Sequence, residues 1–305
     1  MQPLVVIPTY NESENIERML QRIRECLPEA DVLVVDDGSP DGTAELVKKV
    51  AAELDGVYIL ERAAKSGLGS AYRAGFAWGL QRGYDAFVEI DADFSHDPAA
   101  LPSIVGPVAQ GYDVSIGSRY VEGGSIPNWA WHRHLLSRGG NIYASAMLGL
   151  GVADSTAGYR CYSADILRRF DIERIRAEGY GFQIEMTYRS KQHGARITEV
   201  AISFVDREAG QSKMSSFIVV EALALVTWWA LGRLARALKP RGWRGSSRRL
   251  SSATSEPTAP SPTMASRPAT KAAMPARPFF TCEPARSCSS STTGACGTTA
   301  RPAWW

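Results

Sequence analysis

The stretch "AFVEIDADFSH", residues 86–96, begins with the apolar run of a buried strand and then places carboxylates at alternate positions, Glu89, Asp91 and Asp93. Because side chains alternate between the two faces of a strand, these acids share one face and converge where the strand ends. Each ionised carboxylate raises the cost of ionising its neighbours. The pattern predicts a positive charge among them, although the same acids are also typical of a solvated strand end leading into a helix capped by Asp97.

On both sides of this stretch, short apolar runs rich in β-branched residues alternate with helical patterns. The expected strands contain "LVVIPTY" (4–10), "DVLVVDD" (31–37), "GVYILE" (56–61), "AFVEIDAD" (86–93) and "DVSIGSR" (113–119), and the expected helices lie near 14–27, 42–54, 69–82 and 98–109. This alternation predicts parallel βαβ units, and hence an α/β fold with helices on both faces of a mostly parallel sheet. Ligands bind beyond the carboxyl ends of such strands, which is where "PTYNE", "DDGSPDG" and "DADFSH" fall.

The second half of the chain is less regular and ends in a region of low complexity. Helices are expected near 132–149, 163–170 and 179–194, followed by a strand in "ITEVAISFVD" (197–206), a polar loop "REAGQSKMSS" (207–216) and an apolar helix. After Pro240 the Ser/Ala/Thr/Pro/Arg-rich sequence has no hydrophobic periodicity, which is typical of disorder. The sequence therefore predicts a catalytic domain (1–216), an amphipathic membrane-interface helix (217–240) and a basic tail (241–305).

The overall composition is that of a soluble globular protein, with 45% hydrophobic and 22% charged residues among 305. The net charge of +2 hides an acidic body, since residues 1–240 hold 25 Lys/Arg and 30 Asp/Glu, whereas residues 241–305 hold 9 and 2. No nucleic-acid partner is therefore expected. The five cysteines show no metal-ligand spacing, and three of them lie in the tail, which fits a reducing cytosol.

The sequence predicts attachment to a membrane surface without a span. Met1 leads directly into an apolar run, with no basic leader, so we expect a first strand there and no signal peptide. In the best membrane candidate, residues 217–239, charges at Glu221, Arg233 and Arg236 leave too short an apolar run for a comfortable span. Such a helix can lie in the interface of a membrane. We therefore expect a peripheral protein on the cytoplasmic face of a membrane.

The chemistry of the polar clusters argues against a nicotinamide-dependent oxidoreductase. In "GLGSAY" (67–72), Tyr72 occupies the third glycine position of the dinucleotide fingerprint, which in any case belongs after the first strand. Asp36 and Asp37 end the second strand, where carboxylates can accept hydrogen bonds from a base or ribose. Asp91 and Asp93 offer the hard oxygen ligands that Mg²⁺ or Mn²⁺ prefers, and such an ion would offset the charge developing on a diphosphate leaving group.

The chain resembles the dolichol-phosphate (polyprenol-phosphate) mannosyltransferases of glycosyltransferase family 2 over residues 3–239. It shares with them, in this order, "VVIPTYNE", "VVDDGSPDGT", "KSGLGSAYRAGF", "DADFSH", "IGSRY" and "SFVDREAGQSK". The resemblance implies a GT-A fold, which is a Rossmann-like, mostly parallel sheet flanked by helices. It also implies metal-dependent transfer of mannose from GDP-mannose to a polyprenyl (dolichyl-type) phosphate, with inversion at the sugar, giving a lipid-linked sugar donor.

The resemblance also implies a role for individual residues. The implied donor-binding residues are Pro8, Tyr10, Glu12, Val35, Asp37, Asp91, Ala92, Asp93, Arg119, Arg207 and Lys213. Asp91, Asp93 and Arg119 would be catalytic, and Arg207 and Lys213 would close over the donor from a mobile loop. Arg133 and Ser137 would hold the acceptor phosphate. The Mg²⁺ or Mn²⁺ ligands would be Asp91 and Asp93, with Ser95 where some relatives place a glutamine ligand.

Two other functions remain open at this point. One is a polyprenyl-phosphate glucosyltransferase that uses UDP-glucose, although such relatives commonly add clear transmembrane helices. The other is a nucleotide-sugar-binding subunit without turnover, against which Asp91, Asp93, Arg119 and Lys213 speak. Taken singly, Arg119 fits an ion pair with a surface acid, Lys213 a solvated charge and Arg133 an exposed helical position.

No general base is expected. A phosphate monoester, with a second pKa of about 6, is already largely anionic near neutral pH. Asp154 and Glu185 are the acids that would challenge this expectation, and Glu185 is equally compatible with a buried structural role.

Overall fold

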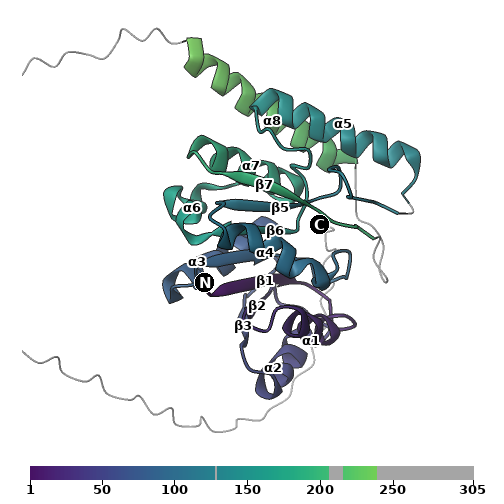
Figure 1. The fold of residues 1–305 in the computed structure, drawn as a ribbon. Helices are drawn as coiled ribbons and strands as arrows, with labels where there is room; N and C mark the ends of the chain where they lie inside the picture. The colour runs from purple at the N-terminus through teal and green to yellow at the C-terminus, as the bar shows by residue number, and fades with distance from the viewer. Residues whose placement is uncertain (128, 206–215, 239–305) are drawn as a thin grey trace, which may run out of the picture. The chain divides into compact units, whose positions relative to one another are not determined.

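The computed structural model describes residues 1–127, 129–205 and 216–238, which form a seven-stranded sheet covered by helices (Figure 1). The strands are β1 (Pro3–Thr9), β2 (Asp31–Asp36), β3 (Val57–Glu61), β4 (Ala86–Glu89), β5 (Val114–Ser118), β6 (Arg160–Ser163) and β7 (Ile197–Ala201). The helices are α1 (Ile16–Cys26), α2 (Thr43–Glu53), α3 (Leu68–Arg82), α4 (Leu101–Ala109), α5 (Trp131–Leu148), α6 (Ala164–Arg169), α7 (Gly179–Gln192) and α8 (Ser216–Leu238), with short 3₁₀ helices at Pro98–Ala100 and Ile172–Arg174. The strand order is β3-β2-β1-β4-β6-β5-β7. The α/β fold expected from the alternation is confirmed.

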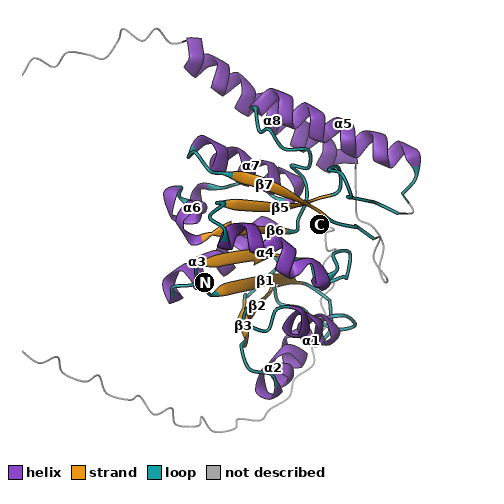
Figure 2. Ribbon diagram, viewed as in Figure 1, coloured by secondary structure: helices purple, strands orange, loops and turns teal. Residues whose placement is uncertain are grey.

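The central strands are buried on both faces, and this is why they appear in the sequence as continuous apolar runs. Leu4 and Val6 of β1 point into a core shared with α3 and α7, whereas Val5 and Ile7 point into a second core shared with α1 and α4. Figure 2 shows the sheet with helices on its two sides. The parallel pairs β1–β2 and β1–β4 bring the carboxyl ends of three strands to one edge of the sheet.

Helix α3 lies unusually close to the sheet because glycines face it. A Cβ built on Gly75 would lie 2.5 Å from Val6 Cγ1, and one on Gly79 would lie 2.5 Å from Phe87 Cε1. Real Cβ atoms do not approach other atoms that closely, so any larger residue would push the helix outward. Gly75 and Gly79 therefore serve helix–sheet packing.

The expected mostly parallel sheet is confirmed, but the sequence analysis did not predict β6, which runs antiparallel to both β4 and β5. This strand is only four residues long and contains Arg160, a charged residue of a type that is seldom fully buried. The Arg160 guanidinium donates to the carbonyls of Ala157 and Ser155 and to Thr187 Oγ1, at 2.6, 2.7 and 2.6 Å. These bonds allow the arginine to be buried. Because Arg160 is charged, β6 does not appear in the sequence as an apolar run.

Among its described side chains, residues 221–235, helix α8 packs on α5 and α7 through one side. Val226 and Ala230 are buried, and the Trp229 ring stacks on Tyr188 with centroids 6.3 Å apart. Trp228 and Leu231, on the other side, are 74% and 58% exposed. Some apolar residues of this helix thus pack against α5 and α7, and others are exposed to solvent. No helix in the described ranges has the length and apolarity that crossing a membrane requires. The expected tail, residues 241–305, lies outside the described residues.

Candidate active site

The carboxylate of Asp36 is occupied by hydrogen bonds within the protein. One of its carboxylate oxygens accepts from Thr9 Oγ1 at 2.8 Å and Ser39 Oγ at 2.5 Å, and the other accepts from the amides of Gly38 and Ser39 at 3.1 and 2.9 Å. The side chain is buried. These hydrogen bonds stabilise the turn after β2 and occupy both carboxylate oxygens. The expectation that Asp36 accepts a hydrogen bond from a base or ribose is therefore corrected.

Asp37, the next residue, ties β2 to the segment that follows β3. Its carboxylate forms an ion pair with Arg62 Nη1 at 3.0 Å and accepts from the Ser66 amide at 2.9 Å. Lys65, in the same segment, places its Nζ 4.2 Å from the centroid of the Tyr10 ring. The sequence reasoning missed Arg62 and Lys65. The signal was available, since Lys65 begins the "KSGLG" motif that follows a parallel strand.

The remaining residues predicted to bind the donor base line the same edge. Pro8 and Val35 are partners in the β1–β2 register. Both side chains are buried, so these two residues contribute mainly their main chains to the edge. The Glu12 amide donates to Thr43 Oγ1 at 3.1 Å, which fixes the loop after β1. The structure thus brings Pro8, Tyr10, Glu12, Val35 and Asp37 to the carboxyl ends of two adjacent strands.

The acidic loop after β4 has its carboxylates in different environments. Asp91 has a side chain that is 37% exposed, whereas Asp93 is buried and accepts from the Ser95 amide at 3.0 Å. Asp97 caps the following 3₁₀ helix by accepting from the Ala99 amide at 2.9 Å, which confirms the expected helix start. Asp91 and Asp93 are therefore the loop acids not explained by the cap.

Glu89 does not add a third full charge to this loop. Burial raises its pKa to about 8, against the lowering effect of Arg160 and Gln183. At neutral pH the carboxyl is mostly protonated. The repulsion that the alternate acids implied is thus partly relieved by neutralising the most deeply buried of them.

His96 is also neutral near pH 7, because burial lowers its pKa to about 4 despite the neighbouring Asp93. Its Nε2 lies 4.0 Å from Asp91 Oδ2, and its ring contacts Tyr159 and Phe204 with centroids 5.1 and 5.2 Å away. The histidine is therefore an aromatic wall of the acidic loop at neutral pH.

Asp91 and Asp93 are the pair of carboxylates that this loop offers to a metal. Among the residues that the structure describes, no group of three or more His, Cys, Asp or Glu side chains is arranged to hold an ion. Mg²⁺ is commonly bound through one or two carboxylates together with substrate phosphates. Asp91 and Asp93 fit that type of site, in which a diphosphate completes the ligand set. Ser95, the third predicted ligand, is buried beside them.

Arg119 follows β5 and is locked to a buried acid. Its Nε and Nη2 donate to the two carboxylate oxygens of Asp154, both at 2.7 Å, and Nη2 also donates to Thr156 Oγ1 at 2.8 Å. Burial acts to lower the pKa of Arg119, but the hydrogen bonds and charge of Asp154 outweigh it and raise that pKa. Burial likewise acts to raise the pKa of Asp154, and Arg119 outweighs it and holds that pKa below its ordinary value. The pair is therefore fully ionised.

Ser137, on α5, is held by a network that leads back to Arg119. The Tyr120 hydroxyl donates to Ser137 Oγ at 2.7 Å, so the serine proton can point elsewhere. Asn141 Nδ2 donates to the Ser137 carbonyl at 3.0 Å and to Thr156 Oγ1 at 3.1 Å. The predicted acceptor residue Ser137 and the predicted catalytic residue Arg119 are thus parts of one polar cluster.

Arg133, the other predicted acceptor residue, stacks on a tryptophan that the sequence did not single out. Its guanidinium carbon lies 3.9 Å from the centroid of the Trp129 ring. The same ring lies 5.8 Å from the guanidinium carbon of Arg119 and meets Phe204 edge-on at 5.8 Å. The aromatic residue between the arginines is the feature that the sequence reasoning missed at this end of the site.

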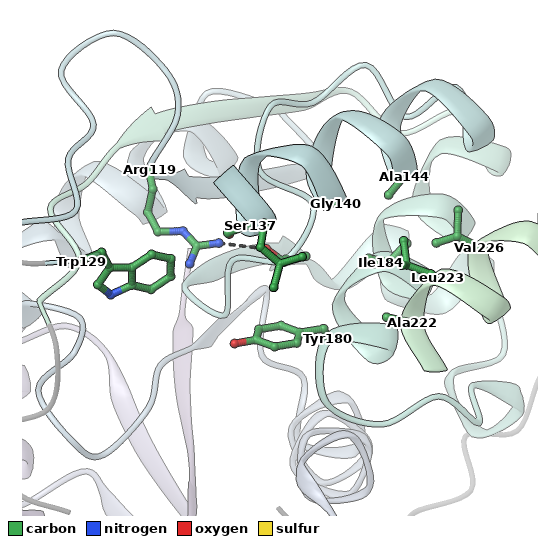
Figure 3. A pocket seen from close by; sticks show the side chains of 12 residues that line it. Arg119, Trp129, Ser137, Gly140, Ala144, Tyr180, Ile184, Ala222, Leu223 and Val226 are labelled. Carbon is green, nitrogen blue, oxygen red and sulfur yellow. Dashed lines mark hydrogen bonds between the residues drawn. The ribbon is translucent and has the colours of Figure 1, made fainter. Parts of the chain in front are cut away.

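A pocket opens from this cluster into the space between α5, α7 and α8 (Figure 3). We call it the acceptor pocket. Its polar end is lined by Arg119, Trp129, Ser137, Thr156 and Tyr180, and its apolar end by Leu136, Gly140, Ala144, Ile184, Ala222, Leu223 and Val226. The pocket holds about 590 Å³ of space, its open mouth included. One end can therefore bind an anion while the other accepts an apolar chain.

Arg207 and Lys213 lie outside the described residues, so the predicted closing loop is not placed.

Comparison with known proteins agrees with this arrangement. The profile of Glycosyl transferase family 2 matches residues 4–170. Undecaprenyl-phosphate mannosyltransferase of Micrococcus luteus is 51% identical over 79% of this chain and 99% of its own, and polyprenol monophosphomannose synthase of Mycolicibacterium smegmatis is 48% identical over 77% and 89%.

A solved structure shares the fold. Glucosyl-3-phosphoglycerate synthase of Mycobacterium tuberculosis, in complex with Mn²⁺, UDP and phosphoglyceric acid, has a TM-score of 0.56 at 20% identity and covers 75% of this chain and 78% of that one. The expected fold of GT-A type is thereby confirmed.

Proposed function

The chain belongs to Glycosyl transferase family 2 and, within it, to the polyprenol-phosphate mannosyltransferases, and on this premise we propose that it transfers mannose from GDP-mannose to a polyprenyl phosphate with inversion at the sugar. The observation that carries the proposal is the acceptor pocket, which joins a polar end at Arg119 and Ser137 to an apolar end between helices. A polyprenyl phosphate has the same division into an anionic head and an apolar tail. The names of the two similar mannosyltransferases support this acceptor and this sugar.

The donor would bind along the edge formed by the carboxyl ends of β1, β2 and β4. Asp91 and Asp93 would hold Mg²⁺ or Mn²⁺ together with the donor diphosphate, and the bound ion would offset the charge that develops on the leaving GDP. The Ser95 amide orients Asp93 for this task. Tyr10 would face the nucleoside, and Asp37, whose buried carboxylate is paired with Arg62, remains a predicted contact of it, as Arg207 and Lys213 remain predicted contacts of the diphosphate.

The chain needs no general base for this reaction, because the acceptor phosphate arrives ionised. Both acids that could challenge this are already engaged. The carboxylate of Asp154 is bonded to Arg119, and Glu185 Oε1 accepts from Arg189 Nε and Nη2 at 2.8 and 2.6 Å. The task left to the protein is to bring two anionic groups together, which Arg119, Ser137 and Arg133 would do through charge-assisted hydrogen bonds.

A transfer assay tests the proposal. The purified chain is incubated with radiolabelled GDP-mannose or UDP-glucose, a short polyprenyl phosphate and Mg²⁺ or Mn²⁺, and the labelled lipid is extracted. We expect label from GDP-mannose in the lipid. Transfer from UDP-glucose alone would replace mannose by glucose in the proposal, and binding of both donors without any transfer would make the chain a non-catalytic subunit.

The apolar end of the acceptor pocket can be filled without disturbing the fold. A Cβ on Gly140 would meet no atom within 4 Å, although the residue lines the pocket. We expect Gly140→Leu to raise the KM for polyprenyl phosphate by at least about tenfold, since an added Leu side chain takes the space of the first isoprene unit. The KM for GDP-mannose should not change.

Its neighbour Gly139 provides the matched control. A Cβ there also meets nothing within 4 Å, but Gly139 is exposed and does not line the pocket. Gly140→Leu and the control Gly139→Leu both replace a helical glycine, and each should raise the unfolding temperature slightly. An equal rise in acceptor KM for the two variants would remove the pocket from the proposal.

We also propose that the protein works peripherally, on the cytoplasmic face of a membrane, through the exposed side of α8. That side carries Trp228, Leu231 and Leu234, and α8 also lines the acceptor pocket. Tryptophan and aliphatic side chains enter the headgroup boundary while basic residues meet anionic lipid. Binding here would place the pocket mouth next to the lipid that supplies the acceptor.

The double variant Trp228→Ser/Leu231→Ser should lower binding to anionic vesicles by roughly tenfold at low salt, because two large apolar side chains no longer leave water. Cosedimentation with vesicles measures this. Tyr58→Ser, which removes an exposed aromatic residue on β3, is the control and should bind like the unchanged protein. Equal loss of binding in control and double variant would contradict the assignment to α8.

A further inference from the structure

The ring of Trp129, which lines the polar end of the acceptor pocket together with Arg119, is in contact with both Arg119 and Arg133. Trp129 lies two residues before α5, and the guanidinium carbons of Arg133 and Arg119 are 3.9 and 5.8 Å from its centroid. Figure 3 shows the ring beside the Arg119 guanidinium, on the side of the pocket opposite the apolar residues. One aromatic side chain thus contacts two arginines that are both predicted to meet the acceptor phosphate.

The two arginines differ in how they are held. Arg119 is fixed by two hydrogen bonds to Asp154 and one to Thr156. Arg133 comes from the first turn of α5, is half-buried and stacks on the face of Trp129. A guanidinium over an aromatic face is attracted by the ring quadrupole, and the stacking restricts a side chain that otherwise has many rotamers. The ring therefore prepares Arg133 before the ligand arrives, which reduces the ordering cost of binding.

The charge of the pocket makes this preparation important. Asp154 already balances Arg119, so a phosphate dianion there needs a second cation. Arg133 is the nearby cation that stacks on Trp129, which itself lines the pocket. Trp129 itself is buttressed edge-on by Phe204, which forms an isolated β-bridge with His96 of the acidic loop.

We propose that Trp129 is a positioning residue of the acceptor site, which holds the Arg133 guanidinium beside Arg119 so that both meet the acceptor phosphate. The proposal rests on the transfer of a sugar to polyprenyl phosphate proposed above. It adds to that function a residue that sets affinity for the phosphate head without touching the donor.

A double-mutant cycle tests this role in detergent, with a short polyprenyl phosphate, so that vesicle binding does not enter. Trp129→Leu should raise the acceptor KM by about tenfold, the effect of losing a well-placed cation–π contact, and leave the donor KM unchanged. Trp129→Phe, which keeps a ring, should stay within about threefold of the unchanged protein. Once Arg133 is replaced by alanine, Trp129→Leu should add less than about twofold, since the two residues act as a unit.

Trp131→Leu is the control, because Trp131 is 77% exposed at the start of the same helix and should leave both KM values unchanged. Thermal unfolding is measured for each variant, and Trp129→Gln replaces Trp129→Leu in the cycle if the leucine variant unfolds early. Additive effects in the cycle, or an equal rise in donor KM, would overturn the positioning role while the proposed function stands. Absence of transfer to polyprenyl phosphate by the unchanged protein would overturn both.

Discussion

Asp93→Ala and Asp91→Ala are each expected to lower kcat by about a thousandfold or more, because the leaving diphosphate loses the counter-charge that a divalent ion supplies, worth several kcal/mol. Asp93 is buried and oriented by the Ser95 amide, whereas Asp91 is partly exposed at the same loop. Neither position offers a neighbouring carboxylate that could take over, since Asp97 is occupied as a helix cap and Glu89 is mostly protonated. Loss of either acid should therefore be nearly complete.

Two measurements separate this from a general loss of structure. Binding of GDP should be strengthened by Mn²⁺ in the unchanged protein and not in Asp93→Ala. Asp97→Ala is the control, since it removes an acid of the same loop and should lower the free energy of unfolding by about 1 kcal/mol through loss of the cap. Full activity of Asp93→Ala in excess chelator would remove the metal from the mechanism.

Arg119→Ala is expected to abolish transfer and to lower the free energy of unfolding by about 3–5 kcal/mol, because it leaves Asp154 buried without its partner. Both carboxylate oxygens of Asp154 depend on Arg119 at 2.7 Å. Arg119→Lys should also fail, since an ammonium group cannot reproduce the two parallel hydrogen bonds. Activity in the transfer assay and denaturant unfolding measure the two effects.

The double variant Arg119→Met/Asp154→Leu separates them. Replacing a buried ion pair by apolar residues of similar size is often neutral for stability, so this variant should unfold within about 1–2 kcal/mol of the unchanged protein and still be inactive. Recovery of activity together with stability would show that Arg119 has a structural role only.

The dependence of the free energy of unfolding on pH should also show the contribution of the Arg119–Asp154 pair. The pKa of Asp154 is lowered in the folded state, so its contribution to stability is present above the unfolded pKa of about 3.9 and is lost as pH falls through the folded value. The double variant lacks this contribution. Its free energy of unfolding should therefore fall less steeply than that of the unchanged protein below about pH 4.

The residues that sequence reasoning found are those whose position follows from a repeating pattern. Asp91 and Asp93 lie at the end of an apolar run, and the alternation of strands and helices brings that end to the same edge as "PTYNE". The parallel pairs β1–β2 and β1–β4 agree with the parallel sheet that this alternation predicts. Helix boundaries agree to within a few residues for the same reason, as at α3 (Leu68–Arg82).

The features that it missed, including the partner of Arg119, depend on contacts between segments far apart in the chain. Arg119 was weighed against an ion pair with a surface acid, and its partner is the buried Asp154, thirty-five positions later. No local pattern marks that pairing. Trp129 acts through Arg133 and Arg119, and the acceptor pocket arises only where α5, α7 and α8 meet. The β6 strand was hidden because the partners that allow Arg160 to be buried come from other elements.

The antiparallel strand β6 also marks a boundary in the sheet at which the chain could be divided in protein engineering. The strands β3, β2, β1 and β4 come from residues before 90, and β6, β5 and β7 come from residues after 113, so the β4–β6 boundary separates two contiguous segments of the chain. Acids predicted to serve the donor lie on the first segment, and the residues of the acceptor pocket lie entirely on the second. A chimera joined between α4 and β5 would therefore exchange the acceptor pocket as a single module and keep the acids predicted to serve the donor, whereas Arg119, Arg207 and Lys213 would be exchanged together with the pocket.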